Sequence, residues 1–176
     1  MRVLLVSRID DGNAVQFAGE LAALLTRAGH RVLPEGELGA RLGMAGVSLH
    51  QAEADLAVVI GGDGSVLRTV QELPRQVPIL GINWGEVGFL AELEKDEALA
   101  FLSTLGRDLP VERRMRISFA LNGTPIGAAL NEAVIVTSRP AKMLRFTVDV
   151  DGVTAERFRA DGMLISTPTG STAYAM

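Results

Sequence analysis

Apolar residues in the first part of the chain form short continuous runs, separated by segments with a different periodicity. The runs RVLLVS at residues 2–7, LAVVI at 56–60 and PILGIN at 78–83 are typical of strands buried on both faces of a parallel sheet. HRVLP at residues 30–34 is a weaker strand candidate. These runs predict the strands of one parallel sheet.

The segments between these runs carry apolar residues at helical spacing. We expect a first helix capped by Asn13 and ended by Gly29, and a second helix that follows the glycine-rich turn at residues 61–64. Residues 35–54 contain several glycines and little periodicity, which predicts a loop with at most one helical turn. Because strands and helices alternate up to about residue 105, the pattern favours a parallel sheet with right-handed crossovers.

The pattern changes in the second part of the chain. Apolar and polar residues alternate across residues 111–168, and the pairs Asn122-Gly123 and Asp151-Gly152 are strong hairpin signals between such runs. This alternation predicts antiparallel β-structure.

Two domains follow from this change of pattern. We expect an α/β domain with a parallel sheet at residues 1–107 and a β-rich, antiparallel, sandwich-like domain at residues 108–176. The strands of the second domain are too few to close a sandwich. We therefore expect that domain to be incomplete in this chain, and to be completed by further sequence or by another subunit.

Composition excludes several classes of function. The chain has no cysteine, which removes disulfides, thiol catalysis and cysteine-bound zinc, and suits a reducing cytoplasm. His30 and His50 are the only histidines and have no partner nearby in the sequence, so we expect no histidine metal site. A net charge of -4 gives no general attraction to nucleic acid or to an anionic membrane. The first residues enter an apolar strand directly, and we expect no export signal and no membrane span.

The stretch DLAVVIGGDGSVLRTV at residues 55–70 places three glycines and an aspartate between a buried strand and a helix. Open α/β sheets bind ligands at the carboxyl ends of their strands, and a helix N-terminus attracts anions. Gly62 and Gly64 would let a phosphate approach the backbone, and Asp63 would accept the proton of an attacking hydroxyl. The alternative is a turn in which Asp63 bonds its own backbone.

Polar side chains in later segments are candidates for the walls of the same site. Asn83 and Phe89 lie in GINWGEVGFLAE, which follows a strand of the parallel sheet and so falls on the same edge as the glycine turn. A turn-forming asparagine and a core phenylalanine are the alternatives. Asn131 and Glu132 form a polar pair in an apolar strand, where a residue on the buried side needs a partner, either a ligand or a structural hydrogen bond.

The stretch RADGMLISTPTGSTAY at residues 159–174 is dense in hydroxyl side chains. Such a run cannot pack an apolar core and suits a surface that surrounds a polar ligand with short hydrogen bonds; a flexible linker is the alternative. Arg159, two residues before Asp161, is a candidate partner for a phosphate or carboxylate. We assign Arg68, in the helix after the glycine turn, to phosphate or nucleotide binding as well.

With these motifs together, the sequence resembles the NAD kinase family. GGDG, N-x-G-x-x-GFL, LNE and DG-x-x-x-STPTGSTAY occur in the order of that family across residues 61–174. GGDG alone is unspecific, because diacylglycerol kinases, sphingosine kinases and phosphofructokinases resemble it at that turn. The last motif is the most specific of the set.

The resemblance implies an enzyme that phosphorylates the 2′-hydroxyl of the adenosine ribose of NAD to give NADP. It implies ATP or polyphosphate as phosphoryl donor, a divalent cation, usually Mg²⁺, and a homo-oligomer, either dimer or tetramer. It makes Asp63 the general base, with Gly62 and Gly64 as the phosphate-facing backbone. The NAD-binding residues that it implies are Asn83, Phe89, Asn131, Glu132, Asp161, Thr169, Thr172, Ala173 and Tyr174.

Some features depart from the family pattern. Trp84 stands where many members have threonine, and Val87 replaces a common leucine, so the pocket wall is expected to differ in shape. Members of the family also continue well beyond the last motif. Two alternatives stay open: a lipid or sugar-phosphate kinase that shares the glycine turn, and a non-catalytic module that holds a dinucleotide and would still bind NAD after Asp63→Asn.

Overall fold

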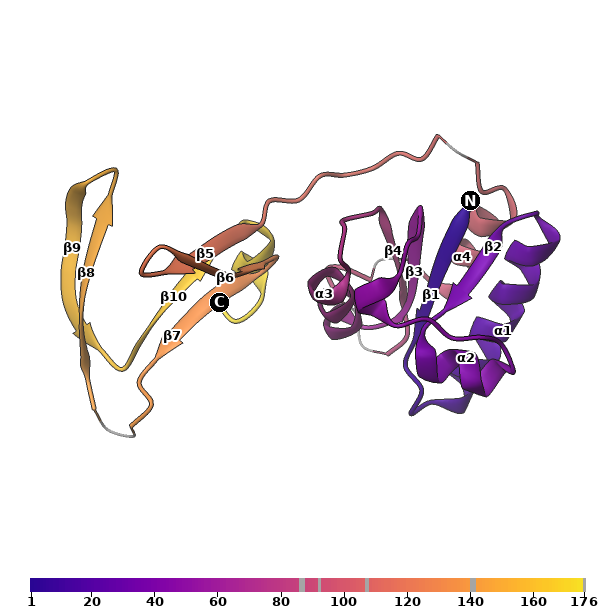
Figure 1. The fold of residues 1–176 in the computed structure, drawn as a ribbon, viewed down its shortest axis with the longest axis horizontal. Coiled ribbons are helices and arrows are strands. Elements are labelled where there is room, and N and C mark those ends of the chain that lie inside the picture. The colour runs from indigo at the N-terminus through magenta and orange to yellow at the C-terminus, as the bar shows by residue number, and fades with distance from the viewer. Residues whose placement is uncertain (86–87, 92, 107, 140–141, 176) are drawn as a thin grey trace. The chain divides into compact units, whose positions relative to one another are not determined.

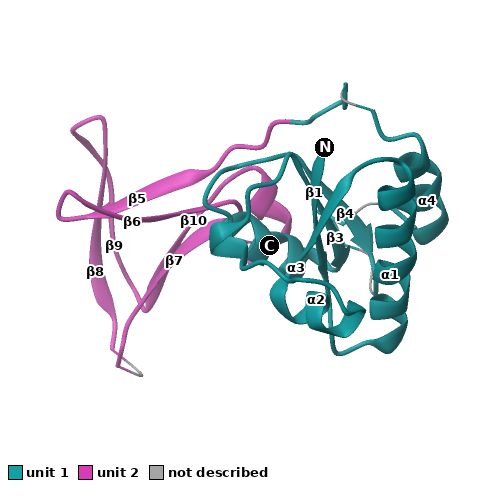
Figure 2. Ribbon diagram, turned by 45° about the vertical axis from the view of Figure 1, so that its right-hand side comes forward, with its two compact units in different colours: residues 1–112 teal, residues 113–176 magenta. Residues whose placement is uncertain are grey.

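The computed structural model describes residues 1–85, 88–91, 93–106, 108–139 and 142–175. The chain divides into two compact units, residues 1–112 and residues 113–176 (Figure 2). In the part of the chain that the structure describes, no helix is long and apolar enough to cross a membrane.

The first unit is built on a four-stranded parallel sheet with the order β2-β1-β3-β4. Its strands are β1 (Arg2–Ser7), β2 (Arg31–Pro34), β3 (Leu56–Gly61) and β4 (Ile79–Asn83). The two central strands are covered on both faces, and β3 is buried along its whole length. This burial explains why their sequences are continuous apolar runs and confirms the predicted parallel sheet.

Helices cover both faces of this sheet. They are α1 (Gly12–Arg27), α2 (Gly36–Leu42), α3 (Asp63–Glu72) and α4 (Lys95–Ser103), with a 3₁₀ turn η1 at Leu49–Gln51. Figure 1 shows α1 and α4 on one face and α3 on the other. The core beneath α1 is formed by Phe17, Leu21 and Leu25, which pack with Leu5 and Val58 of the sheet. Apolar spacing along α1 therefore predicted the correct buried face.

Two sequence expectations in this unit were wrong in detail. Asp11, not Asn13, caps α1, because its side chain accepts hydrogen bonds from the main-chain N–H groups of Asn13 and Ala14. Residues 35–54 hold both α2 and η1 instead of a loop with at most one turn. α2 is short and glycine-rich, and its buried Leu38 lies in the core of the unit, so tertiary packing overrides a weak local helix propensity.

The second unit consists of antiparallel strand pairs, as predicted. β5 (Ile117–Leu121) pairs with β6 (Thr124–Ala129), β7 (Glu132–Val136) with β10 (Gly162–Ser166), and β8 (Leu144–Val150) with β9 (Val153–Ala160), followed by a 3₁₀ turn η2 at Thr169–Thr172. Both predicted hairpin turns are present, since Asn122 and Asp151 adopt positive φ angles of 50° and 51°. Left-handed backbone at these positions is what a two-residue hairpin turn requires.

Apolar side chains of the second unit remain largely on its surface. Val134, Ile135 and Val136 of β7 and Ile165 of β10 are exposed. The strands form three separate two-stranded ladders, which are stabilised locally by contacts such as the stacked Phe146 and Phe158 rings, 5.3 Å apart.

Candidate functional site

The glycine turn lies at the carboxyl end of β3, where α3 begins at Asp63. The glycines of this turn are suited to their positions for different physical reasons. A Cβ on Gly61 would collide with the Ser65 side chain, so close packing requires that glycine. A Cβ on Gly62 or Gly64 would meet no atom within 4 Å, so these glycines leave open space beside the start of a helix. Such space, next to helix N–H groups, is what an approaching phosphate needs.

The Asp63 carboxylate is held by main-chain groups of the segment after β4. Oδ2 accepts a hydrogen bond from the Phe89 nitrogen at 2.9 Å, and Oδ1 accepts from Leu90 at 2.9 Å and from Ala91 at 3.3 Å. Asp63 itself is half-buried. These three donors all belong to the main chain, and they orient the carboxylate without an ion pair to any described residue.

Gly88 makes this arrangement possible. A Cβ at that position would overlap Asp63 Oδ1 and would lie 2.8 Å from Asp63 Cγ. The sequence interpretation included Gly88 in the motif N-x-G-x-x-GFL but gave it no role. Only its contact with a residue distant in sequence reveals the reason for a glycine. Val87, named as a departure from the family pattern, lies outside the described residues.

Asn83 and Phe89 lie at the same sheet edge as the glycine turn. Asn83 is the last residue of β4 and pairs in register with Gly61. Its Oδ1 atom is buried and accepts no hydrogen bond from any described residue. A buried polar atom without a partner is costly, so Asn83 is suited to bind a ligand. Phe89 is 58% exposed, which contradicts the alternative of a plain core residue and leaves its ring available for stacking.

Arg68 contacts a carboxylate within the same unit. Its guanidinium donates two hydrogen bonds to Glu35, of 2.8 Å and 2.7 Å. The hydrogen bonds that Arg68 donates to the Glu35 carboxylate raise the pKa of Arg68. The Arg68 side chain remains 45% exposed, so a phosphate contact by this residue stays a prediction.

In the second unit, Asn131 and Glu132 form a polar corner at the start of β7. Both residues are half-buried, and Asn131 Oδ1 and Glu132 Oε2 have no hydrogen-bond partner among the residues that the structure describes. The alternative interpretation, a structural hydrogen bond, is therefore not met at these two atoms by any residue that the structure describes. Their unpaired acceptors favour the ligand interpretation.

The hydroxyl-rich segment is bonded to this corner. Thr167 is 2% exposed, and its hydroxyl donates to the Leu130 carbonyl at 2.6 Å while accepting from the Gly170 nitrogen at 3.1 Å. The Thr167 nitrogen donates to the Asn131 carbonyl at 2.8 Å. A Cβ on Gly170 would collide with that same carbonyl. The second unit thus brings the LNE and STPTGSTAY motifs together.

The other hydroxyls of this segment serve partly local roles. The Thr172 hydroxyl donates to the Thr169 carbonyl at 3.3 Å, and the Ser171 hydroxyl donates to the Pro168 carbonyl at 2.7 Å. These bonds shape η2 as a tight turn, which explains part of the hydroxyl content without a ligand. Ala173 is half-buried, whereas Tyr174 is 76% exposed and its ring is accessible.

Asp161 lies between β9 and β10, and Arg159 lies in β9. Both are exposed, and Arg159 pairs in register with Arg145 of β8, which places two cations on neighbouring strands. The Asp161 carbonyl accepts a hydrogen bond from the Thr137 nitrogen at 2.9 Å, which fixes the backbone at this corner. Among the described residues, no hydrogen bond or ion pair joins these two side chains to Asn131 or Glu132.

Sequence reasoning overlooked Thr167 as a distinct residue within the hydroxyl run. It is the hydroxyl that is buried and bonded on both sides, whereas its neighbours are exposed or half-buried. A signal was available, because Thr167 directly precedes Pro168 near the end of the apolar run at residues 163–168. That position favours a side chain that closes a turn through its own hydroxyl.

Family models match both parts of the chain. The model of the ATP-NAD kinase N-terminal domain matches residues 3–108, and that of the ATP-NAD kinase C-terminal domain matches residues 130–176. A protein of Methanoculleus marisnigri named NAD kinase is 58% identical over 176 residues, which cover 100% of this chain and 65% of that protein. The chain thus spans about 65% of the length of the curated relatives it matches.

Solved structures of similar fold include a crystal structure of an NAD kinase from Archaeoglobus fulgidus in complex with ATP. It is 32% identical, with a TM-score of 0.73, and the match covers 99% of this chain and 64% of that chain. Yeast NADH kinase complexed with NADH has a TM-score of 0.84 at 21% identity, over 99% of this chain and 56% of that one. The second likeness concerns the fold alone.

Proposed function

The chain belongs to the NAD kinase family, and we propose on that premise that the protein phosphorylates the 2′-hydroxyl of the adenosine ribose of NAD to give NADP. The observation that carries the proposal is the Asp63 carboxylate, fixed by main-chain donors beside the open glycines of the turn. A carboxylate held next to a phosphate-accepting helix start has the arrangement that hydroxyl phosphorylation requires.

In the proposed reaction, Asp63 accepts the proton of the ribose 2′-hydroxyl. The hydroxyl oxygen forms a bond to the terminal phosphorus of the donor, and the bond between that phosphorus and the leaving phosphate oxygen breaks. Main-chain N–H groups at Gly62 and Gly64 would face the transferred phosphate, because a Cβ at either position would meet no atom within 4 Å and the space there is open. Arg68 and Arg159 are proposed as further phosphate or nucleotide contacts.

We propose NAD contacts in both units of the chain. Asn83 and Phe89 of the first unit would face the adenine, supported by the unpaired buried Oδ1 of Asn83 and the exposed Phe89 ring. Asn131 and Glu132 would hold the ribose, supported by their unpaired acceptor atoms. The remaining proposed NAD-binding residues are Asp161, Thr169, Thr172, Ala173 and Tyr174.

We propose that the divalent cation is bound by the phosphates of the phosphoryl donor. In the described residues, no group of three or more His, Cys, Asp or Glu side chains could hold a metal ion, and we assign none of them to Mg²⁺. In kinases Mg²⁺ is commonly bound through substrate phosphates, whose charge it offsets. ATP or polyphosphate as donor, a homo-oligomer and a cytoplasmic location are further proposals; the first two rest on the family, the last on the cysteine-free composition.

The experiment that tests the proposal is an assay of NADP formation from NAD and Mg²⁺ with ATP or polyphosphate. NADP is detected with a dehydrogenase that accepts only NADP. We expect NADP with at least one donor. Phosphorylation of a lipid or of a sugar phosphate instead would replace the proposal with another kinase class, and NAD binding without NADP would assign a non-catalytic module.

A further inference from the structure

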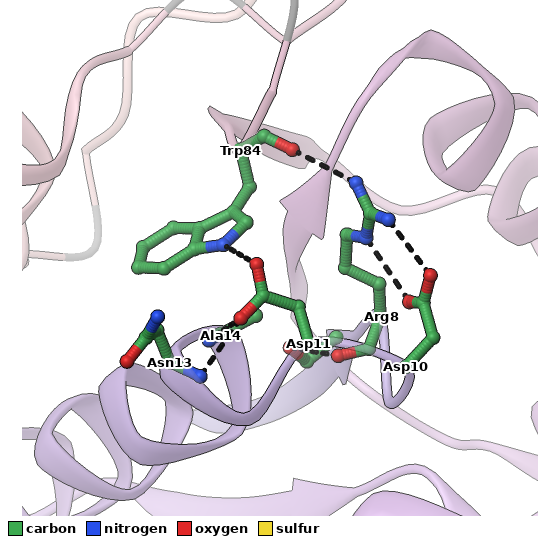
Figure 3. A network of polar contacts seen from close by, with 7 residues as sticks. Arg8, Asp10, Asp11, Asn13, Ala14 and Trp84 are labelled. Carbon is green, nitrogen blue, oxygen red and sulfur yellow. Dashed lines mark hydrogen bonds and ion pairs between the residues drawn. The ribbon is translucent and has the colours of Figure 1, made fainter.

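Trp84 takes part in a polar network that joins the carboxyl ends of β1 and β4 (Figure 3). Its indole nitrogen donates to Asp11 Oδ2 at 2.9 Å, and its main-chain carbonyl accepts from Arg8 Nη1 at 3.3 Å. Arg8 in turn donates to both oxygens of Asp10, at 3.1 Å and 2.7 Å. The loop between β1 and α1 is thereby tied to the end of β4.

Asp11 uses both of its carboxylate oxygens in this network. Oδ2 accepts from the Trp84 indole, while Oδ1 accepts from the Asn13 nitrogen at 2.8 Å and from the Ala14 nitrogen at 3.4 Å. The second set of bonds caps α1. An asparagine has only one acceptor oxygen, so it can keep the cap or the indole bond but not both.

The network reaches the glycine turn through main-chain bonds. The Trp84 nitrogen donates to the Gly61 carbonyl at 3.3 Å, and the Arg8 nitrogen donates to the Ile60 carbonyl at 3.1 Å. These bonds bracket the end of β3 from both neighbouring strands, directly before Asp63. The Trp84 ring also stacks on Phe17 of α1, with centroids 5.3 Å apart, which anchors it to the core.

We propose that Trp84, held by Asp11 and Arg8, is a positioning residue that fixes the ends of β3 and β4 and so sets the orientation of Asp63 relative to Asn83. The part of this inference that concerns the rate of NADP formation rests on the proposed function. Trp84 precedes the residues whose N–H groups hold Asp63, and it bonds the carbonyl of Gly61 two residues before Asp63. A displacement of Trp84 would therefore move both the end of β3 before Asp63 and the segment whose N–H groups hold its carboxylate.

Two variants perturb the indole bond in different ways. Trp84→Phe keeps a ring to stack on Phe17 and removes the N–H donor, and Asp11→Asn keeps one acceptor and loses the other. Asp55→Asn is the matched control, because Asp55 also accepts a main-chain bond, from the Arg2 nitrogen at 2.7 Å, but at the opposite edge of the sheet. The double variant Asp11→Asn/Trp84→Phe tests whether both changes act through one bond.

The readout that does not depend on activity is hydrogen exchange at the amides of Phe89, Leu90 and Ala91 in the purified protein. We expect both single variants to speed exchange at these amides about tenfold, the double variant to add little, and Asp55→Asn to leave them unchanged. Trp84 is the only tryptophan, so its fluorescence will also shift in Asp11→Asn but not in Asp55→Asn.

The kinetic readout separates positioning from general destabilisation. We expect kcat for NADP formation to fall about tenfold in Trp84→Phe, with a smaller rise in the KM for NAD. Unchanged exchange at residues 89–91 in both folded variants would overturn the inference, as would an unchanged kcat. If the unmutated protein forms no NADP, the proposed function fails, and the exchange experiment still decides the role of Trp84.

Discussion

Asp63 Oδ1 lies 2.9 Å from the main-chain nitrogen of Leu90, a residue that follows the next strand of the sheet. The bond joins the start of α3 to the segment after β4, so the Asp63 carboxylate links two segments of the candidate site. Main-chain donors have little freedom to move, and they hold the carboxylate in one orientation before any ligand binds. Preorganisation of this kind is what an effective proton acceptor requires.

Gly88→Ala should disturb this orientation. The added Cβ would lie 2.8 Å from Asp63 Cγ and displace the carboxylate, and a misplacement of about 1 Å can cost about 100-fold in rate. We therefore expect a loss of that order in NADP formation, measured as kcat. Gly106→Ala is the control, since a Cβ there meets no atom within 4 Å. Equal rates for the two variants would contradict the role of Gly88.

Asp11 predicts a specific sensitivity to acid. The hydrogen bond from the Trp84 indole, followed by that from the Asn13 nitrogen, lowers the pKa of Asp11 below its ordinary value of 3.8. A carboxyl group whose pKa is lower in the folded state than in the unfolded state stabilises the fold at pH values above its unfolded-state pKa. This contribution to stability is lost as the pH falls through the folded-state pKa. The charged group that faces Asp11 is Arg8.

Asp11→Asn should therefore reduce stability at neutral pH and flatten the loss of stability below a pH of about 3.8. Urea unfolding followed by Trp84 fluorescence at a series of pH values measures this. Asp10 and Asp55 also have lowered pKa values and remain in the variant, so the comparison isolates Asp11. Parallel stability curves for the variant and the unmutated protein would argue against the prediction.

Arg68 and Glu35 offer a test of phosphate binding. Their ion pair is partly exposed, and we expect Arg68→Ala and Glu35→Gln each to lower the free energy of unfolding by about 0.2–1 kcal/mol. If Arg68 also contacts the phosphoryl donor, only Arg68→Ala will raise the KM for that donor. Steady-state kinetics with varied donor and saturating NAD measure this difference. The same KM in both variants would limit Arg68 to a structural role.

Thr167 should hold the backbone in place at Asn131 and Glu132. Thr167→Val leaves the Leu130 carbonyl and the Gly170 nitrogen without a partner, at a cost of about 1–3 kcal/mol. We expect weaker NAD binding, measured by calorimetry, and a lower midpoint of unfolding. Thr147→Val is a matched control on the exposed face of β8 in the same unit. Unaltered NAD affinity in Thr167→Val would separate the corner from NAD binding.

Features with a local cause were predictable from the sequence. The turn at Asn122-Gly123 needs left-handed backbone, which these two residue types adopt readily, and the hairpin is present where expected. The apolar run at residues 56–60 is buried on both faces, as its continuous apolar sequence predicts for a strand whose sheet is covered by helices on both sides.

Features that depend on distant contacts were not predictable. Nothing near Gly88 in the sequence indicates that its missing Cβ makes room for Asp63. Asp11 and Asn13 are both good caps, and the choice between them depends on where β1 ends and on the bond to Trp84. α2 forms because Leu38 is buried in the core, although its sequence is rich in glycine.

The most direct test of the account compares NADP formation by the unmutated protein and by Asp63→Asn, with NAD affinity measured for both. The amide oxygen of asparagine can still accept from Leu90, so the NAD site should survive the change. We predict a loss of about 10²–10⁴-fold in kcat with NAD affinity nearly unchanged, as expected for removal of a general base. A variant that forms NADP at close to the unmutated rate would contradict the role assigned to Asp63.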